Sequence, residues 1–574
     1  AAFAQHGLPH VLAPQEVERI PAYRDSRAGL HRGIETPPDV PVRTMAEWEE
    51  IQSLVICWTD YTGILKQIVR YAKDECEVII VCTDPNAVID QLEDNSYGGP
   101  MGLGNITFLQ APFNSIWMRD YGAETIYTNE VDSLFLLDWI YNRPRPDDDV
   151  LPDAIAASKG IGVYSTAQAP NDLVHTGGNF MCDGAGTAFS SELVLDENGP
   201  AGEFNQTIKD EAQVDALMAL WMGITPGRYI KMTTLPFDGI HHIDMHMKLL
   251  DEETLLVGEF PAGESDGPQL ELNVQDVLDH NTSVFGTPYH VVRIPMPSST
   301  GGQFPPNASY RTYANNVFIN RTVLVPTYRT EYDSIGLRIL REELPGYRVI
   351  GIDCDNADMN IISASGAIHC ITKSIGVADP LLIRHQPLSD TDNSIDPYAV
   401  NAYIRHRSGI ANATLYWTTD TAQGYAAVPM AAVDANGNWQ GFIPAQPAGT
   451  VVFYYIGATA NSGKVQVRPI VAPEGQWQFR VNGPTGILES SAPVVVALYP
   501  NPATDVVVLA LSEGQGLATV TLHDALGRTV KRYTAQAVPA GGRLFLDVSS
   551  VPAGAYELVV ERSEGRTPLR FTKQ

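Results

Sequence analysis

Residues 53–82 have the sequence SLVICWTDYTGILKQIVRYAKDECEVIIVC, and this stretch decides the fold expected for the first part of the chain. It begins and ends with apolar runs typical of buried strands. Between these runs, Ile64, Ile68 and Tyr71 recur at the spacing of one helix face. The stretch therefore predicts a strand, a helix and a second strand, the β-α-β unit from which α/β domains are built.

The same alternation continues after this unit. A helical pattern covers residues 85–92, and a strand pattern follows at residues 106–110. Comparable segments continue to about residue 385, and the apolar run at residues 380–384 is expected to be the last strand. We therefore assign the first two-thirds of the chain to the α/β class, although no repeat is visible in its sequence.

From about residue 386 the pattern changes to short alternating runs separated by turn residues. Residues 413–417 and 451–456 are two such runs, and residues 434–437 are a turn signal. This change predicts an immunoglobulin-like β-sandwich over residues 387–483. Residues 484–495 have the composition of a linker.

A small all-β domain is expected over residues 496–574. Its strand patterns lie at residues 506–511, 519–523 and 556–560. The motifs LYPNPATD, LGR and VPAGAY begin at residues 498, 526 and 551, and the end of the chain is basic. These motifs resemble the C-terminal sorting domain of proteins that use the type IX secretion system. The resemblance implies a bacterial protein that is secreted or attached to the outer surface, with the secretion machinery as a partner.

The charge of the chain limits its partners. Its 574 residues include 38 basic and 67 acidic side chains, for a formal net charge of −29. Such a balance disfavours nucleic acids and anionic membranes, and it either attracts cationic ligands or serves solubility alone. No run of about 18 apolar residues predicts a membrane span. No basic-then-apolar signal peptide is seen, and residues 1–5 are compatible with the remnant of a cleavage site.

Six cysteines are scattered along the chain without a CxxC pair, so neither a zinc ribbon nor a disulfide-stapled fold is indicated. Cys370 differs from the others because it ends the small-residue stretch SASGAIHC at residues 363–370. A nucleophilic cysteine needs access and either a depressed pKa or a neighbouring base. Taken alone, this segment fits a buried structural cysteine as well as a nucleophile.

The segment GIHHIDMHMK at residues 239–248 carries three candidate functional groups. Strand alternation would place His242, Asp244 and His246 on one face. Two interpretations remain open. The trio could hold a metal ion, or His242 and Asp244 could serve a remote cysteine in acid/base chemistry.

Two shorter segments complete the set. Residues 116–122, IWMRDYG, place the carboxylate of Asp120 three positions after Trp117. Residues 175–179, HTGGN, contain the adjacent glycines Gly177 and Gly178, which allow the main chain to approach a ligand closely. Alone, the first segment fits a core tryptophan beside an ion pair, and the second fits an ordinary turn.

Together these four segments resemble the agmatine deiminase and bacterial Porphyromonas-type peptidylarginine deiminase family of the guanidino-group-modifying superfamily. The resemblance covers about residues 45–385 and rests on Trp-x-Arg-Asp, Gly-Gly-Asn, His-x-Asp and His-Cys in this order. It implies a five-bladed α/β propeller around a central funnel. The catalytic domain would then occupy residues 41–386, after an N-terminal extension at residues 1–40.

The resemblance also implies roles for individual residues. Cys370 would be the nucleophile, His242 the general acid/base, and Asp120 and Asp244 the clamp of a guanidinium group. Two carboxylates suit this planar cation with five donors, and they fix its carbon in line with a thiolate. No metal or organic cofactor is needed. The substrate-binding positions implied by the resemblance are Trp117, Gly177, Gly178 and Asn315.

Arg143 and Arg145 lie in the segment DWIYNRPRPDDD at residues 138–149, which is similar to the stretch by which the peptidylarginine enzymes hold a carboxylate. On an extended backbone both side chains would point to one side and could hold the α-carboxylate of a C-terminal arginine. The alternative is a surface loop in which residues 147–149 neutralise the two arginines. Thr176 replaces the glutamate of agmatine deiminases, which argues against agmatine as the substrate.

The sequence thus predicts a secreted cysteine-dependent peptidylarginine deiminase that forms citrulline and ammonia from peptides or proteins with arginine, preferably C-terminal. An agmatine or free arginine deiminase is the first alternative. A metallohydrolase that uses His242, Asp244 and His246, and an inactive surface protein that captures arginine peptides, are the others.

Overall fold

The computed structural model divides into two compact units, Ala1–Arg480 and Val481–Gln574. The part of the chain that it describes comprises residues 8–27, 30–482, 495–511, 516–538, 543–562 and 565–574. Residues 1–5 and nearly all of the predicted linker at 484–495 lie outside these ranges. Within the ranges, no helix is both long and apolar enough to cross a membrane.

The expected β-α-β unit is confirmed. Strand β2 (Ile51–Cys57) is followed by helix α3 (Thr62–Ala72) and by strand β3 (Glu77–Cys82), which pairs with β2 in parallel. Helix α3 turns Ile64 and Ile68 into the core, where neither side chain is exposed. Helix α4 (Pro85–Glu93) and strand β4 (Ile106–Gln110) continue the alternation, also as predicted.

One strand closes the first sheet from far along the chain. β17 (Lys373–Gly376) pairs antiparallel with β2, so this sheet has the order β17-β2-β3-β4. The pairing brings the segment just before β17 to the start of the α/β region. Cys370 lies in that segment.

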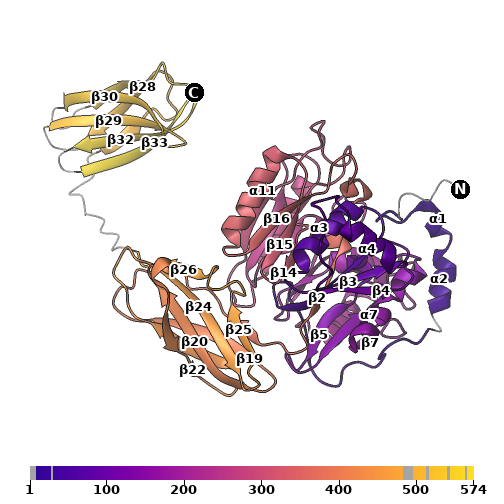
Figure 1. Cartoon of the computed structure of the whole chain (residues 1–574). Helices are drawn as coiled ribbons and strands as arrows, with labels where there is room; N and C mark the ends of the chain where they lie inside the picture. The colour runs from indigo at the N-terminus through magenta and orange to yellow at the C-terminus, as the bar shows by residue number, and fades with distance from the viewer. Residues whose placement is uncertain (1–7, 28–29, 483–494, 512–515, 539–542, 563–564) are drawn as a thin grey trace. The chain divides into compact units, whose positions relative to one another are not determined.

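Four further sheets make up the rest of the α/β region (Figure 1). Their strands are β1 (Val42–Thr44), β5 (Glu124–Thr128), β6 (Leu134–Asp138) and β7 (Gly162–Ser165); β8 (Met181–Cys182), β9 (Ala188–Ser191) and β10 (Tyr229–Met232); β11 (Met247–Leu249), β12 (Thr254–Glu259) and β13 (His290–Pro295); β14 (Val317–Ile319), β15 (Thr322–Thr327) and β16 (Arg348–Asp353). The region is therefore a mixed α/β structure.

All five sheets share one plan. Each contains an antiparallel pair and a parallel pair that has a helical crossover between its strands. The crossover helices other than α3 and α4 are α6 (Pro146–Asp149), α7 (Leu151–Lys159), α8 (Leu193–Asn198), α9 (Glu211–Met222), α10 (Gly267–His280) and α11 (Thr330–Glu343). The structure thus repeats a ββαβ unit that leaves no visible repeat in the sequence.

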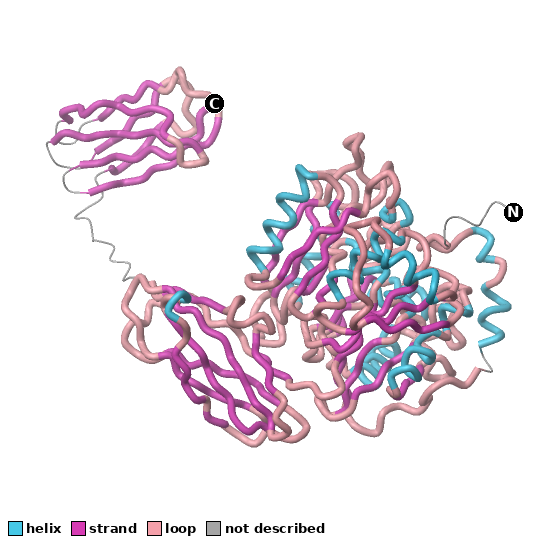
Figure 2. The backbone as a smooth tube through the Cα atoms, in the orientation of Figure 1, coloured by secondary structure: helices cyan, strands magenta, loops and turns pink. Residues whose placement is uncertain are grey.

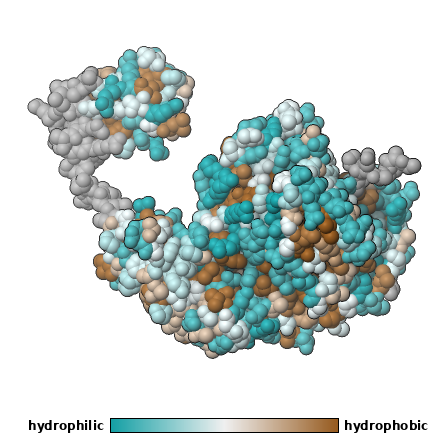
Figure 3. Space-filling view, in the orientation of Figure 1, coloured by the Kyte–Doolittle hydropathy of each residue, from teal (hydrophilic) through white to brown (hydrophobic). Residues whose placement is uncertain are grey.

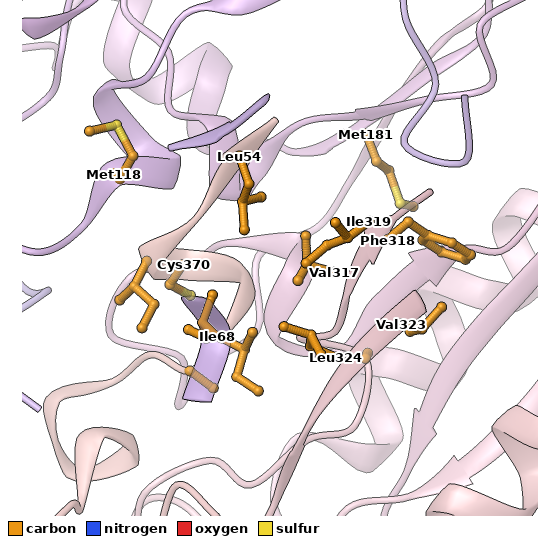
Figure 4. Close-up of a cluster of buried hydrophobic side chains, with 14 of the residues drawn as sticks. Leu54, Ile68, Met118, Met181, Val317, Phe318, Ile319, Val323, Leu324 and Cys370 are labelled. Carbon is orange, nitrogen blue, oxygen red and sulfur yellow. The ribbon is translucent and has the colours of Figure 1, made fainter. Parts of the chain in front are cut away.

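A continuous hydrophobic core joins these sheets (Figure 4). Leu54 of β2, Val317 of β14, Leu324 of β15 and Cys370 are all fully buried members of it. Burial of such side chains contributes about 25 cal/mol per Å² of apolar surface. The core therefore fixes the elements that carry the candidate site.

The apolar run at residues 380–384 was expected to end the α/β region, and this prediction is wrong. Its strand β18 (Leu382–Arg384) pairs with β19 (Tyr398–Arg405) in the following β-rich part. An apolar run of this length can pack on either neighbour, because its pattern does not specify a partner. The last strand of the α/β region is β17.

The β-rich part contains two sheets. One has the order β18-β19-β23-β22, and the other has the order β21-β20-β24-β25 with β26 paired to β24. Their remaining strands are β20 (Ile410–Thr418), β21 (Ala426–Pro429), β22 (Ala431–Ala432), β23 (Asn438–Ile443), β24 (Val451–Ala460), β25 (Val465–Arg468) and β26 (Trp477–Arg480). Both predicted runs, at 413–417 and 451–456, lie in strands.

The second unit is built of strands in the residues described (Figure 2). Two sheets, β27-β28-β31 and β30-β29-β32-β33, enclose a core of its own. The strands are β27 (Val495–Tyr499), β28 (Val506–Leu511), β29 (Gly516–Asp524), β30 (Thr529–Val538), β31 (Arg543–Asp547), β32 (Gly554–Arg562) and β33 (Gly565–Lys573). The three strands predicted in this unit are confirmed.

The N-terminal extension differs from the extended arm expected for it. Helices α1 (Pro14–Val17) and α2 (Ile20–Arg27) interrupt it, and Ile20 and Tyr23 pack against Ile140 and Val174 of the α/β region. Pro14 at the first position of α1, with the Glu16 carboxylate accepting a hydrogen bond from the Ala13 backbone N–H, explains why a helix starts here without a long periodic pattern. On the face of the α/β region shown in Figure 3, hydrophilic residues cover most of the surface.

Candidate active site

Cys370 lies in a turn of 3-10 helix (His369–Ile371) and is fully buried. Its Sγ accepts a hydrogen bond from Asn315 Nδ2 at 3.1 Å and lies 3.6 Å from Asp244 Oδ2. The small residues before it have a steric purpose. A Cβ atom at Gly366 would lie 2.4 Å from the ring of Trp117, so only glycine fits there. The turn therefore holds the thiol against a carboxylate.

His242 and Asp244 do not lie on a strand, so the predicted alternation is wrong. A 3-10 turn (Ile243–Met245) follows His242, which still has extended backbone. The turn directs the Asp244 carboxylate toward Cys370, and the Nε2 atom of His242 lies 3.1 Å from Thr176 Oγ1. The pattern failed because two-residue spacing along a strand cannot be told apart from a tight turn over so few residues.

The proposed metal trio is not assembled by this turn. Among the described residues, the histidine and acid side chains whose ligand atoms lie close enough to share an ion are His10, Asp120 and His242. Asp244 and His246 are not part of that group. The geometry therefore contradicts the predicted metal trio of His242, Asp244 and His246.

Asp120 stands opposite, on the one-turn helix α5 (Met118–Tyr121), with Oδ1 3.5 Å from His242 Nδ1. Gly177 and Gly178 begin a 3-10 turn (Gly177–Asn179) beside it. A Cβ atom at Gly178 would lie 2.5 Å from His242 Nδ1, and one at Gly177 would lie 2.1 Å from a backbone carbonyl. Both glycines are thus required for the close packing of the main chain against Arg119 and His242, while their predicted approach to a ligand stays a prediction.

The two carboxylates are ionised although they are buried. Burial raises the pKa of Asp244, but the imidazole of His369, with Nδ1 2.7 Å away, outweighs it and holds the pKa below its ordinary value. Burial likewise raises the pKa of Asp120, and the nearby His10 and His242 reverse the shift. Oδ1 of each aspartate has no hydrogen-bond partner. Such a site favours a cation that brings several donors.

The comparison with known proteins decides the family. A model of the Porphyromonas-type peptidyl-arginine deiminase family matches residues 43–375. The chain belongs to this family. A second model, of the secretion system C-terminal sorting domain, matches residues 497–573 and marks a secreted or outer-surface bacterial protein.

Known relatives and structures agree with this assignment. A Vibrio parahaemolyticus protein assigned as an agmatine deiminase is 24% identical over 298 residues, which cover 47% of this chain and 78% of the relative. The solved agmatine deiminase of Enterococcus faecalis is 17% identical and has a TM-score of 0.50 over 60% of this chain and 99% of its own. That of C. jejuni is 19% identical, with a TM-score of 0.48, 59% of this chain and 97% of its own covered. The match to the Enterococcus faecalis structure shows that the α/β region has the fold of that deiminase.

The sequence analysis predicted no role for two residues of this deiminase site, His369 and Glu47. His369 contacts Asp244 through Nδ1, and its Nε2 lies 2.5 Å from Glu47 Oε1. Glu47 also pairs with Lys248 and Arg119. Burial opposes ionisation of Glu47, but His369 and Lys248 hold its pKa well below the ordinary value. His369, which is held by Glu47, thus orients the carboxylate of Asp244.

The Cys370 thiol is neutral in this resting site. Burial, followed by the charges of Asp244 and Asp120, raises its pKa well above the ordinary value of 9.0. His242 is neutral as well, because burial lowers its pKa to about 4. The deiminase therefore rests without a thiolate–imidazolium pair.

A direct prediction follows for the free protein. The difference in ultraviolet thiolate absorbance between the natural chain and its Cys370→Ser variant should stay flat up to pH 9 and rise only above it, because the raised pKa keeps the thiol protonated. The measurement is a pH titration of both proteins. A thiolate signal near neutral pH would instead show an ion pair with His242.

The N-terminal extension enters this site, which the sequence did not predict. The His10 ring stacks on Trp117 with a centroid distance of 4.2 Å, and its Nε2 lies 2.5 Å from Asp120 Oδ2. Trp117 Nε1 donates to the Leu8 carbonyl at 2.9 Å. His10 is fully buried.

Arg143 and Arg145 also contact this extension. The continuous extended backbone expected for them is absent, because residues 142–144 form a bend in which the Arg145 N–H donates to the Arg143 carbonyl at 2.8 Å, just before the short helix α6 (Pro146–Asp149). Arg143 Nε donates to the His10 carbonyl at 3.1 Å, and Arg145 Nε and Nη2 donate to the two carboxylate oxygens of Glu16 at 2.8 and 3.1 Å. Both arginines are buried.

The alternative of a surface loop neutralised by residues 147–149 is therefore wrong. Asp147 and Asp148 accept hydrogen bonds from Asn114 and Ser115. Asp149 pairs with arginines of the N-terminal extension. The backbone N–H of Asp149 donates to the Arg145 carbonyl at 3.1 Å, but no side chain of the three has a hydrogen bond or ion pair to either guanidinium in the described structure. The carboxylate that pairs with Arg145 is thus that of Glu16 in the N-terminal extension, not one from residues 147–149.

Proposed function

We propose that the protein is a secreted peptidylarginine deiminase that converts a C-terminal arginine of a peptide into citrulline and releases ammonia. The observation that carries this proposal is the bidentate grip of Arg145 on a carboxylate next to a site with two ionised aspartates. A C-terminal arginine offers both a guanidinium and a free carboxylate, whereas agmatine offers the guanidinium alone.

The fold supports a funnel-shaped site. Five sheets with the same ββαβ plan are the number that a five-bladed propeller requires. The site residues come from segments next to different sheets, as they would if they met on a central axis. We propose the catalytic domain at about residues 41–376, with β18 moved to the sandwich that was expected to begin at 387, and the sorting domain at 496–574.

The first half of the reaction forms a bond from Cys370 Sγ to the guanidinium carbon. A guanidinium held between Asp120 and Asp244 offsets the negative charge that keeps the thiol protonated. The thiol proton of Cys370 is transferred to His242 as the resulting thiolate attacks the guanidinium carbon. The tetrahedral adduct then breaks its bond to nitrogen, and His242 as imidazolium gives the proton to the leaving ammonia.

The second half releases the product. His242, neutral again, takes a proton from a water molecule, which attacks the carbon of the covalent thiouronium. The carbon–sulfur bond breaks with its electron pair returning to Sγ, which takes back the proton held by His242. The hydroxyl group of the adduct loses its proton to water and becomes the carbonyl of the ureido group of citrulline. Asn315 Nδ2 faces Sγ and can stabilise the sulfur as it departs with the electron pair.

Arg143→Ala and Arg145→Ala test the carboxylate. We expect each change to raise the KM for a peptide with a free C-terminal arginine by about 10- to 100-fold relative to agmatine, because a charge-assisted hydrogen bond is lost. The ratio of the two KM values is the readout, since Arg145 also contacts Glu16 and that contact affects both substrates alike. An equal effect on both substrates would refute carboxylate recognition.

A second candidate is agmatine deamination, which the assignment of the Vibrio relative favours. Thr176, whose Oγ1 faces His242, speaks against it on the expectation drawn from the sequence. Ammonia release from agmatine, from free arginine and from peptides with C-terminal or internal arginine separates the candidates. Activity that survives a strong chelator would eliminate a metallohydrolase, and binding without ammonia release would indicate a capture protein.

A further inference from the structure

We propose that residues Leu8–Glu16 are a built-in inhibitor, which occupies the substrate site as an arginine peptide would and must leave before turnover. This inference rests on the proposed function for the identity of the substrate. That the segment occupies the site is argued from its contacts alone.

His10 takes the place of the guanidinium. Its Nε2 lies 2.5 Å from Asp120 Oδ2, and its Nδ1 lies 2.7 Å from the Ser365 carbonyl, five residues before the nucleophile. The imidazole ring also covers Trp117 at 4.2 Å with an angle of 8° between the planes. A planar nitrogen-rich ring on an aromatic face and a carboxylate fulfils the same contacts as a guanidinium.

Glu16 takes the place of the substrate carboxylate. Arg145 holds it with two hydrogen bonds, and the side chain of Glu16 is 2% exposed. Between the two ends, Arg143 Nε donates to the His10 carbonyl, and Arg145 Nη2 donates to the Pro9 carbonyl at 2.7 Å. One segment thus engages both the aspartate and the arginines.

The rest of the extension holds this segment in place. Ala13 N donates to Glu16 at 2.9 Å, which shapes the segment, while Ile20 and Tyr23 of α2 pack on the α/β region and Arg27 pairs with Asp149. The segment is therefore presented at a high effective concentration. A substrate has to compete with it, which raises the apparent KM without altering the chemical step.

His10→Ala in the full chain tests the first contact. We expect the KM for a peptide with C-terminal arginine to fall by about 10-fold or more while kcat stays unchanged, since a charge-assisted contact of the inhibitor is lost. The matched control is His31→Ala, because His31 belongs to the same extension but is exposed. A fall in kcat would instead make His10 a catalytic residue and overturn the proposal.

Glu16→Gln tests the second contact without touching the guanidinium position. It should lower the KM in the same way, because a neutral amide binds Arg145 less tightly. Glu18→Gln is its control, with the same chemical change two residues away at an exposed position. If Glu16→Gln behaves like Glu18→Gln, the segment does not compete through Arg145.

Alkylation of Cys370 by iodoacetamide, followed by mass spectrometry, is the experiment that does not depend on catalysis. His10→Ala and Glu16→Gln should both accelerate it several-fold over the natural chain, while the two controls leave it unchanged. The buried Cys57 and Cys354 report unfolding if they react as well. Faster alkylation without citrulline formation would refute the proposed function but keep the inhibitor. Unchanged alkylation with normal turnover would refute the inhibitor alone.

Discussion

Cys370→Ala should abolish ammonia release from a peptide with C-terminal arginine, with kcat reduced by about 10⁴-fold or more. The thiol is the nucleophile of the proposed reaction, and its neighbours Asn315 and Asp244 offer no substitute that could form a covalent adduct. Single-turnover assays with a colorimetric citrulline readout measure the loss. Substrate binding should persist, because the guanidinium contacts of Asp120 and Asp244 remain.

The control for this change is Cys76→Ala, another buried thiol, which lies just before β3 and is not among the residues that contact Cys370. It should keep its kcat, and both variants should unfold at similar temperatures. Residual turnover by Cys370→Ala at more than a small percentage of the natural rate would disprove the assignment of the nucleophile.

Asp120→Asn and Asp244→Asn should each lower kcat/KM by roughly 30- to 5,000-fold, which corresponds to the 2–5 kcal/mol lost when one partner of a buried charge pair is neutralised. Asparagine keeps the shape of the side chain, so the loss comes from the charge that faces the guanidinium. The Asp244 change should also lower kcat, because this carboxylate lies 3.6 Å from the sulfur and fixes the carbon of the substrate in line with it.

Asp172→Asn provides the matched control. Asp172 is a fully buried carboxylate that is paired with Lys209, away from the site. Its replacement should lower the free energy of unfolding but leave kcat/KM within a small factor of the natural value. If all three variants lost activity in proportion to their stability, the clamp would have no support.

The sequence predicts the α/β region well where the periodicity of its apolar residues matches the buried face of the element. The β-α-β unit at residues 53–82 is found as expected, because two mostly apolar strands flank a helix with one apolar face. Four motifs also identify most residues of the site, since their chemistry needs those side chains whatever turn presents them. Asp120, His242, Asp244, Asn315 and Cys370 all gather there.

Other parts of the site depend on contacts that no local pattern encodes. Glu47 reaches His369 across 322 residues, and His10 reaches Asp120 across 110. The turn at Asp244 and the partner of β18 are also decided by tertiary packing, since either segment is compatible with a strand in the α/β region. The sequence alone therefore could not predict these contacts between distant charged side chains, because they depend on how the sheets are arranged.

The pairing of β17 with β2 has a consequence for the timing of maturation. Strands β2, β3 and β4 are complete once residue 110 has emerged, but their sheet lacks its last strand until residue 376 is available. Cys370 arrives with that last strand, so the nucleophile joins its aspartate only in the final closure of the domain. A chain halted before this point has every carboxylate of the clamp but no thiol beside it. Only a chain whose synthesis has passed the whole domain can therefore carry out the proposed reaction.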